Sequence, residues 1–335
     1  MEFAVLGVRD LSVRIGRHEI VSIDELDLPA GRRLGLVGES GSGKTMTAMS
    51  LAGLAPAEAR QCGSIVLDGH ELVGLGDKQL ARVRGAQMGV IFQDPLRALN
   101  PTMRIGRQID EAVRLHANLS RAERRERVLE LMSHVQLSEP ERLVRRYPHQ
   151  LSGGQRQRVL IAMAIASGPR LLIADEPTTA LDVTVQKEIL GLLVRLSEER
   201  QMALLFVSHD LGVVRAVCEY VAVLYGGRLV ETGPVRTVIH RPRHRYTEAL
   251  IGANPGHASA DDLAAVNGRQ LTAIPGVVPS IDAFPIGCRF RDRCAHAVAA
   301  CADDPPMERL AGEHRFACFN PTIAAKEWEL DGNAR

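Results

Sequence analysis

The chain has 335 residues, of which 45% are hydrophobic and 24% charged, the balance of a globular protein rather than a disordered or fibrous one. Its net charge of +1 gives no electrostatic reason to expect nucleic acid or anionic lipid as the main partner. The longest apolar run, residues 159–166, is far shorter than the about 20 residues of a membrane-spanning helix. The amino terminus lacks the basic start and apolar core of a secretory signal, so we expect the chain to stay in the cytoplasm.

Short apolar runs alternate with longer amphipathic segments, which predicts an α/β fold with a mainly parallel sheet flanked by helices. The predicted strands are residues 34–37, 64–68, 88–92, 171–174 and 203–207. Between about residues 95 and 165 the pattern is charged and helical, so we predict a helical subdomain inserted into the sheet domain. From about residue 254 onward periodicity fades and prolines are frequent. We therefore predict a first domain over residues 1–253 and a small second domain over residues 254–335.

A glycine-rich turn follows the first predicted strand and precedes a predicted helix over about residues 45–54. It reads Gly38-Glu39-Ser40-Gly41-Ser42-Gly43-Lys44-Thr45, which matches the phosphate-binding pattern G-x-x-x-x-G-K-[ST]. Glycines let successive backbone N–H groups turn toward phosphate oxygens, and the helix that follows adds its positive end. Lys44 supplies a charge for the β- and γ-phosphates, and the Thr45 hydroxyl can ligate Mg²⁺. The sequence therefore predicts a site for ATP and Mg²⁺.

Two carboxylates, Asp175 and Glu176, end the predicted strand over residues 171–174. Ligands of open α/β sheets bind at that edge. Asp175 can hold Mg²⁺ directly or through water, and Glu176 can accept the proton of an attacking water. Beside a phosphate loop, the pair indicates a nucleotide-hydrolysing site.

Four further segments, in this order along the chain, make the sequence resemble the ATP-binding-cassette (ABC) family. They are Gln93 after a strand, as in the Q-loop; Leu151-Ser152-Gly153-Gly154-Gln155, as in the signature motif; Ala180-Leu181-Asp182, as in the D-loop; and His209 after a strand, as in the switch histidine. The resemblance covers roughly residues 1–250. It implies a P-loop fold with a RecA-like sheet core and a helical subdomain.

The resemblance also implies how the residues act. Two cassettes face head to tail, and the signature residues Ser152, Gly154 and Gln155 contact ATP held by the partner's phosphate loop, beside the D-loop residue Asp182. His209 contacts the γ-phosphate, and Gln93 senses Mg²⁺. Together with Glu176 as the base, His209 and Gln93 are the predicted catalytic residues. We predict that the remaining histidines, including those between residues 240 and 244, lie on the surface.

One feature departs from the family, which usually places an aromatic ring near the amino terminus to stack on adenine. The corresponding position, just before Gly16, is Ile15. Stacking on a base contributes about 1–3 kcal/mol. We therefore expect weaker discrimination between bases.

The segments Phe92-Gln93-Asp94-Pro95 and Leu99-Asn100-Pro101, together with the C-terminal extension, resemble the ATPases of dipeptide, oligopeptide and nickel importers. Members dedicated to nickel often lack the extension, which favours peptides. The alternatives are a nickel or other solute importer, an exporter ATPase, and a soluble ABC ATPase of translation or DNA repair. A single phosphate loop, compact motif spacing and neutral charge argue against the soluble class.

The importer resemblance implies four partners: a second ATPase that is commonly a related chain, two transmembrane permeases and an external binding protein. It places the chain peripherally on the cytoplasmic face of the bacterial inner membrane.

The extension contains four cysteines, Cys288, Cys294, Cys301 and Cys318, whose spacing is not that of common zinc sites. Four thiolates can still bind zinc or an iron–sulfur cluster. Some peptide-importer ATPases with this pattern carry a [4Fe–4S] cluster, so the resemblance favours that cofactor over zinc or no metal. The neighbouring Arg289, Arg291 and Arg293 would then offset the cluster's negative charge.

Overall fold

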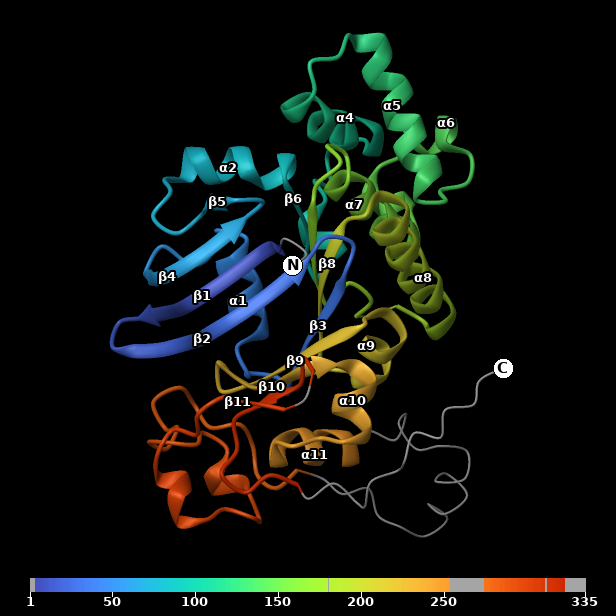
Figure 1. The fold of residues 1–335 in the computed structure, drawn as a ribbon. Coiled ribbons are helices and arrows are strands. Elements are labelled where there is room, and N and C mark those ends of the chain that lie inside the picture. Colours follow the sequence, from blue (N-terminus) through green and yellow to red (C-terminus); the bar gives the residue numbers. More distant parts are fainter. Residues whose placement is uncertain (1–3, 180, 254–273, 311, 323–335) are drawn as a thin grey trace.

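The computed structural model describes residues 4–179, 181–253, 274–310 and 312–322, and one long sheet organises them (Figure 1). The strands are β1 (Ala4–Ile15), β2 (His18–Pro29), β3 (Arg33–Val37), β4 (Ala59–Leu67), β5 (His70–Glu71), β6 (Met88–Ile91), β7 (Leu171–Asp175), β8 (Ala203–Ser208), β9 (Tyr220–Tyr225), β10 (Arg228–Pro234), β11 (Glu308–Arg309) and β12 (Arg315–Phe316). The helices are α1 (Lys44–Leu51), α2 (Asp77–Ala86), α3 (Pro95–Ala98), α4 (Ile105–His116), α5 (Arg121–His134), α6 (Pro140–Leu143), α7 (Gly153–Ala164), α8 (Val183–Arg200), α9 (Leu211–Val217), α10 (Val235–His240) and α11 (Arg245–Gly252). No helix in these described ranges is long and apolar enough to span a membrane.

The sheet runs in the order β5-β4-β1-β2-β10-β9-β3-β8-β7-β6, and β12 pairs with both β10 and β11. Its central strands are parallel, as predicted: β3 pairs with β8 and β9, and β7 pairs with β6 and β8. The amino-terminal part is not parallel, because β1 pairs antiparallel with β2 and β4. The sequence analysis missed β1 and β2 because their alternating buried and exposed residues give no continuous apolar run.

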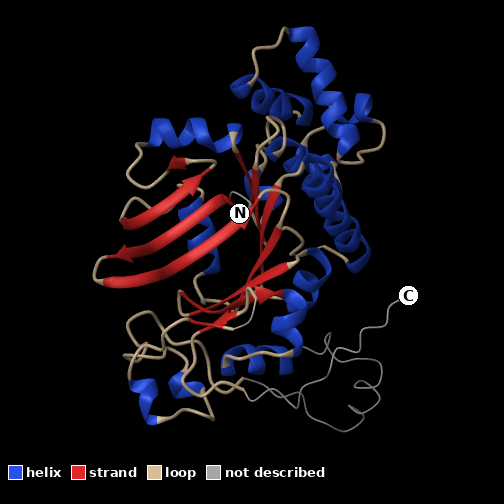
Figure 2. Ribbon diagram, viewed as in Figure 1, coloured by secondary structure: helices blue, strands red, loops and turns tan. Residues whose placement is uncertain are grey.

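The central strands are buried on both faces, and their alternate residues contribute to two hydrophobic cores. On β7, Leu172 belongs to the core beneath the helices α4 to α9, and Leu171 belongs to the core shared with α1, β1 and β2. This alternation follows from the period of two residues along a strand. Helices therefore cover the sheet on both sides (Figure 2).

Between β6 and β7 the chain is helical, as the charged pattern predicts, and α4, α5 and α6 lie beyond the β6 edge of the sheet (Figure 1). Ser120 begins α5 with a capping box, in which its hydroxyl accepts the N–H of Glu123 and the Glu123 carboxylate accepts the N–H of Ser120. The limits proposed for this subdomain and for the two domains stay predictions.

The C-terminal extension packs on the cassette. Its strand β12 adds to the main sheet beside β10, where Glu231 faces Phe316. Phe290 of the extension is buried against Tyr225 of β9 and Tyr246 of α11, with ring centroids 5.2 Å and 5.3 Å away. The described part of the extension therefore shares a core with the cassette.

Candidate nucleotide site

The phosphate loop joins β3 to α1 and needs its glycines. Gly41 and Gly43 have φ of +81° and +100°, a region that L side chains rarely adopt. A Cβ on Gly38 would lie 2.2 Å from the carbonyl oxygen of Leu224. Ser40, Gly41 and Thr45 are exposed, whereas Gly38 and Ser42 are buried. The loop thus offers backbone N–H groups and the start of α1 to an anion at the surface.

Polar groups of the loop are left available for a ligand. Lys44 is 6% exposed, and its ammonium donates to the carbonyl oxygens of Gly38 and Glu39 at 2.8 Å and 2.9 Å. Burial lowers the pKa of Lys44, and the carboxylates of Glu176, Asp175 and Glu39 act in the opposite sense. The buried hydroxyl of Ser42 has no hydrogen-bond partner within the part of the chain that the structure describes. Buried polar atoms are rarely left so, and a phosphate oxygen fits this one.

Asp175 ends β7 next to the loop. The Thr45 hydroxyl donates to its carboxylate at 3.4 Å, so the two oxygen groups predicted for Mg²⁺ face each other. Burial raises the pKa of Asp175, and the Thr45 hydrogen bond opposes that shift. A cation bound between these oxygens would offset the cost of burying the carboxylate.

Glu176 brings the other predicted catalytic residues together. Its carboxylate accepts hydrogen bonds from the Gln93 amide at 3.0 Å and from the Thr179 hydroxyl at 3.0 Å. The Nδ1 atom of His209 lies 3.1 Å from the other carboxylate oxygen. Glu176 itself has φ of +46°, which is strained for a residue with a side chain. Thr179 was missed by the sequence analysis, although its hydroxyl three residues after Glu176 is a signal that could have found it.

The signature residues form a separate group at the start of α7. The Ser152 hydroxyl accepts the N–H of Gln155, and the Gln155 side chain accepts the N–H of Ser152, so both cap the helix. A Cβ on Gly154 would lie 2.6 Å from the Cγ1 atom of Val185 in α8, which explains glycine there. Asp182 caps α8 by accepting the N–H of Val185. Ala180, the first D-loop residue, lies outside the described residues.

The four cysteines of the extension lie near one another. Electrostatic interactions with the other three contribute to the raised pKa of Cys288, about 11, although burial is the largest cause. Burial also raises the pKa of Cys294 and of Cys318. Among the described residues, however, no group of three or more His, Cys, Asp or Glu side chains is placed to hold a metal ion. The predicted iron–sulfur or zinc site therefore has no support from the side-chain arrangement.

The prediction that the remaining histidines lie on the surface is wrong for His244 and His314, which are 1% and 3% exposed. His244 caps α11 by accepting the N–H of Tyr246 with Nδ1, and burial lowers its pKa to about 3. His314 lies 2.7 Å from the buried carboxylate of Glu231. Phe290 of the extension lies beside His244, with ring centroids 6.2 Å apart, whereas His314 belongs to the extension and reaches Glu231 of β10. The sequence pattern near either histidine does not show these contacts between distant segments.

Comparisons with known proteins agree with this geometry. Residues 21–179 match the family described as "ABC transporter". The chain is 42% identical to the "Oligopeptide transport ATP-binding protein OppD" of Escherichia coli over 95% of this chain and 94% of that protein. The chain belongs to the ATP-binding proteins of ABC transporters. It is therefore an ATPase, and the predicted family and fold class are confirmed.

Two other comparisons add to the assignment of this ABC ATPase. Residues 230–301 match the family described as "Oligopeptide/dipeptide transporter, C-terminal region". The chain is 43% identical to the "Probable peptide ABC transporter ATP-binding protein y4tR" of Sinorhizobium fredii, over 94% of both chains.

Among solved structures, the ATP-binding cassette MJ0796 bound to ADP and Pi, described as dimeric, is similar with a TM-score of 0.61 and 29% identity. That match covers 69% of this ABC ATPase and 99% of the solved chain. The structure of cbiO1 from Clostridium perfringens, part of the ABC transporter complex cbiONQ, gives a TM-score of 0.62 at 25% identity, over 70% of this chain and 90% of that one.

Proposed function

We propose that this ATPase supplies the energy for a bacterial importer of di- and oligopeptides. The observation that carries the proposal is the extent of the match to proteins named for peptide import. It covers nearly the whole chain, and residues 230–301, which include part of the extension, match the oligopeptide/dipeptide transporter C-terminal region.

In the proposed reaction the phosphate loop binds ATP through its backbone N–H groups and Lys44. Thr45, Asp175 and Gln93 would hold Mg²⁺, which neutralises charge on the phosphates. Glu176 accepts a proton from the attacking water, and His209 contacts the γ-phosphate. The hydrogen bonds from Gln93 and Thr179 support these roles because they fix the Glu176 carboxylate beside the loop.

We further propose that the site is completed by a second cassette. Ser152 and Asp182 are exposed, and the polar contacts described above for the signature residues serve their own helices. These residues, with Gly154 and Gln155, are therefore free to contact a nucleotide on another subunit. The similar cassette MJ0796 is dimeric. We propose a related chain as the second subunit.

The remaining partners follow from the proposed importer role. They are two transmembrane permeases and an external substrate-binding protein, with this subunit peripheral on the cytoplasmic face of the inner membrane. Co-fractionation of the chain with two permease subunits in membranes would support this arrangement. Recovery of the chain without permeases, on ribosomes or on DNA, would contradict it.

The substrate is tested by uptake in cells that lack this chain and receive it back on a plasmid. We expect labelled di- and oligopeptide uptake to depend on the chain and nickel uptake to be independent of it. Nickel uptake that depends on the chain, with unchanged peptide uptake, would assign the subunit to the alternative importer class.

We also propose a cofactor for the four cysteines of the extension, on the family resemblance. Cys288, Cys294, Cys301 and Cys318 would hold a [4Fe–4S] cluster, or zinc as the alternative. Protein purified without air should then contain about four iron and four sulfide per chain. Preparations free of both iron and zinc would show that the thiols hold no metal.

A further inference from the structure

The phosphate loop contains a carboxylate that a triphosphate site does not need. Glu39 is the second residue of the loop, and its backbone carbonyl accepts a hydrogen bond from the Lys44 ammonium at 2.9 Å. The Glu39 side chain lies close enough to Lys44 to interact with it electrostatically. A negative charge so close to bound phosphates opposes ATP binding unless another group compensates it.

Arg293 of the extension compensates that charge. Two of its guanidinium nitrogens donate to the two carboxylate oxygens of Glu39 at 2.8 Å and 3.0 Å, a bidentate pair across 254 positions of sequence. Arg293 also donates to the Tyr225 hydroxyl at 3.2 Å and to the carbonyl oxygen of Pro275 at 2.7 Å. Arg293 is 9% exposed, and its guanidinium lies over the Tyr225 and Phe290 rings. Its geometry is therefore fixed on several sides.

The backbone of the loop is held from the same side. The N–H of Glu39 donates to the Tyr246 hydroxyl at 2.7 Å, and Tyr246 packs on Phe290 of the extension. The N–H of Gly227 donates to the carbonyl oxygen of Ser42 at 2.7 Å. The guanidinium of Arg289 donates to the carbonyl oxygen of the adjacent Gly226. Two separate routes thus join the extension to the loop.

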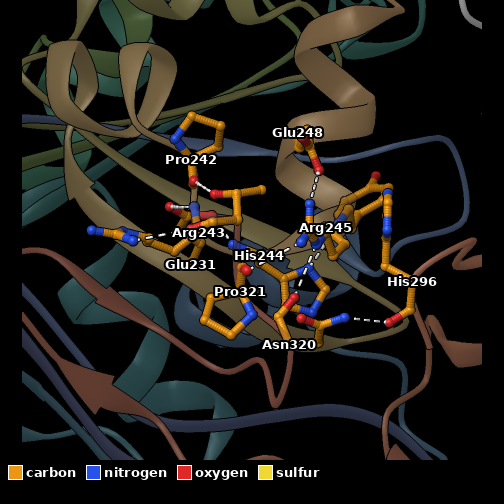
Figure 3. Close-up of polar contacts among 11 residues, drawn as sticks. Glu231, Pro242, Arg243, His244, Arg245, Glu248, His296, Asn320 and Pro321 are labelled. Carbon is orange, nitrogen blue, oxygen red and sulfur yellow. Dashed lines mark hydrogen bonds and ion pairs between the residues drawn. The ribbon is translucent and has the colours of Figure 1, made fainter. Parts of the chain in front are cut away.

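A polar network also joins residues 320–322 of the extension to the start of α11 (Figure 3). Arg245 donates to the carbonyl oxygens of Asn320 at 2.9 Å and Pro321 at 3.2 Å. Arg243 exchanges hydrogen bonds with Thr322, each at 3.0 Å. The buried carboxylate of Glu231 accepts the N–H groups of Arg243 and His244 at 2.8 Å each.

We propose that Arg293 is a positioning residue for ATP: it neutralises and holds Glu39, so that the C-terminal extension sets the nucleotide affinity of the phosphate loop. The inference needs only the ATP-binding role of the loop. It does not depend on the transported solute, on the catalytic base or on any metal at the cysteines.

The test measures equilibrium binding of AMP-PNP and ADP by calorimetry on the purified full chain, with the KM and kcat of ATP hydrolysis. Arg293→Met should weaken AMP-PNP binding roughly tenfold, and ADP binding less, because fewer phosphate charges meet the uncompensated carboxylate. The KM for ATP should rise while kcat stays within about twofold of wild type. Arg291→Met is the matched control, because Arg291 is on the same short 3-10 helix but contacts Asp292 and Ile286 instead of the loop.

The double variant R293M/E39Q distinguishes charge compensation from simple structural support. It should regain most of the lost AMP-PNP affinity, because the opposing carboxylate is gone. A double variant as weak as R293M, or an R293M protein with unchanged affinity, would overturn the proposal. If R293M does not fold, E39Q alone decides: it should bind AMP-PNP more tightly than wild type, and unchanged or weaker binding would contradict the inference.

Discussion

The phosphate site and the junction between cassette and extension differ in what their charged groups do. At the phosphate site, charges lie close to one another without full pairing: Lys44 contacts only carbonyl oxygens through its hydrogen bonds, and the Ser42 hydroxyl has no partner among the described residues. At the junction, the carboxylate of Glu231 is buried, accepts the N–H groups of Arg243 and His244, and lies 2.7 Å from the His314 ring. The first arrangement is poised for a ligand, and the second stabilises the fold. Substitutions should therefore separate activity from stability.

The largest effect is expected at Glu176. Glu176→Gln keeps the size of the side chain but removes the proton acceptor, so ATP hydrolysis should fall by about 10²–10⁴-fold. ATP binding and the thermal midpoint should change little, because Glu176 lies outside the hydrophobic cores. A phosphate-release assay checks the rate, with Glu126→Gln on the exposed face of α5 as control. Near-normal hydrolysis by E176Q would assign the base elsewhere.

At Phe290 we expect a loss of stability rather than a loss of the catalytic base. This side chain is 3% exposed and packs on Tyr225 and Tyr246. Phe290→Ala should lower the free energy of unfolding by about 3–5 kcal/mol, because it leaves a cavity in the junction. Denaturant unfolding measures the change. Phe319→Ala, at a 37% exposed position of the same extension, should cost no more than about 0.5 kcal/mol. Equal losses in the two variants would show that the junction does not pack as described.

His244 adds a dependence of stability on pH. Burial lowers its pKa from 6.5 to about 3, so between these values the unfolded chain takes up a proton that the folded chain excludes. Above pH 6.5 both states are neutral and the contribution to stability is complete. As the pH falls from 6.5 toward 3, the contribution of His244 to the free energy of unfolding should decrease by about 1.4 kcal/mol per pH unit. His244→Asn keeps an acceptor for the Tyr246 N–H but cannot titrate, so its stability profile should be flatter. Parallel profiles would contradict this account.

The smallest effect is expected at Ile15, the half-buried last residue of β1. If the adenine base lies against this residue, Ile15→Tyr should strengthen ATP binding relative to GTP binding by roughly fivefold, a part of the stacking energy of a base. Competition between the two nucleotides measures the ratio. A strong ATP preference that the substitution leaves unchanged would place base recognition elsewhere.

The residues of the phosphate site could be predicted from sequence because each lies in a short motif at the end of a strand. The loop over residues 38–45 and the pair Asp175 and Glu176 need only local chain geometry to reach the same sheet edge. Parallel pairing of β3, β7 and β8 then brings them together.

The junction could not be predicted in the same way. Arg293 was expected to offset the charge of a metal cluster, but it pairs with Glu39 across the molecule. His244 looked like a surface residue because the group that buries it comes from a distant segment. Contacts of this kind depend on how the extension packs on the cassette. The spacing of apolar residues along a segment predicts its own secondary structure but not its distant contacts. The antiparallel pairing of β1 with β2 and β4 was also not predicted, because half-exposed strands have no distinct apolar run.

We propose that ATP hydrolysis at the Glu176 site drives peptide import. It is tested most directly in vesicles that contain the complete transporter, with ATP on the side of this subunit and peptide with its binding protein on the other. Phosphate release and peptide accumulation are measured together for wild type and Glu176→Gln, with equal amounts of permease. We predict that the substitution abolishes both. Peptide accumulation that continues after hydrolysis is lost would contradict the account.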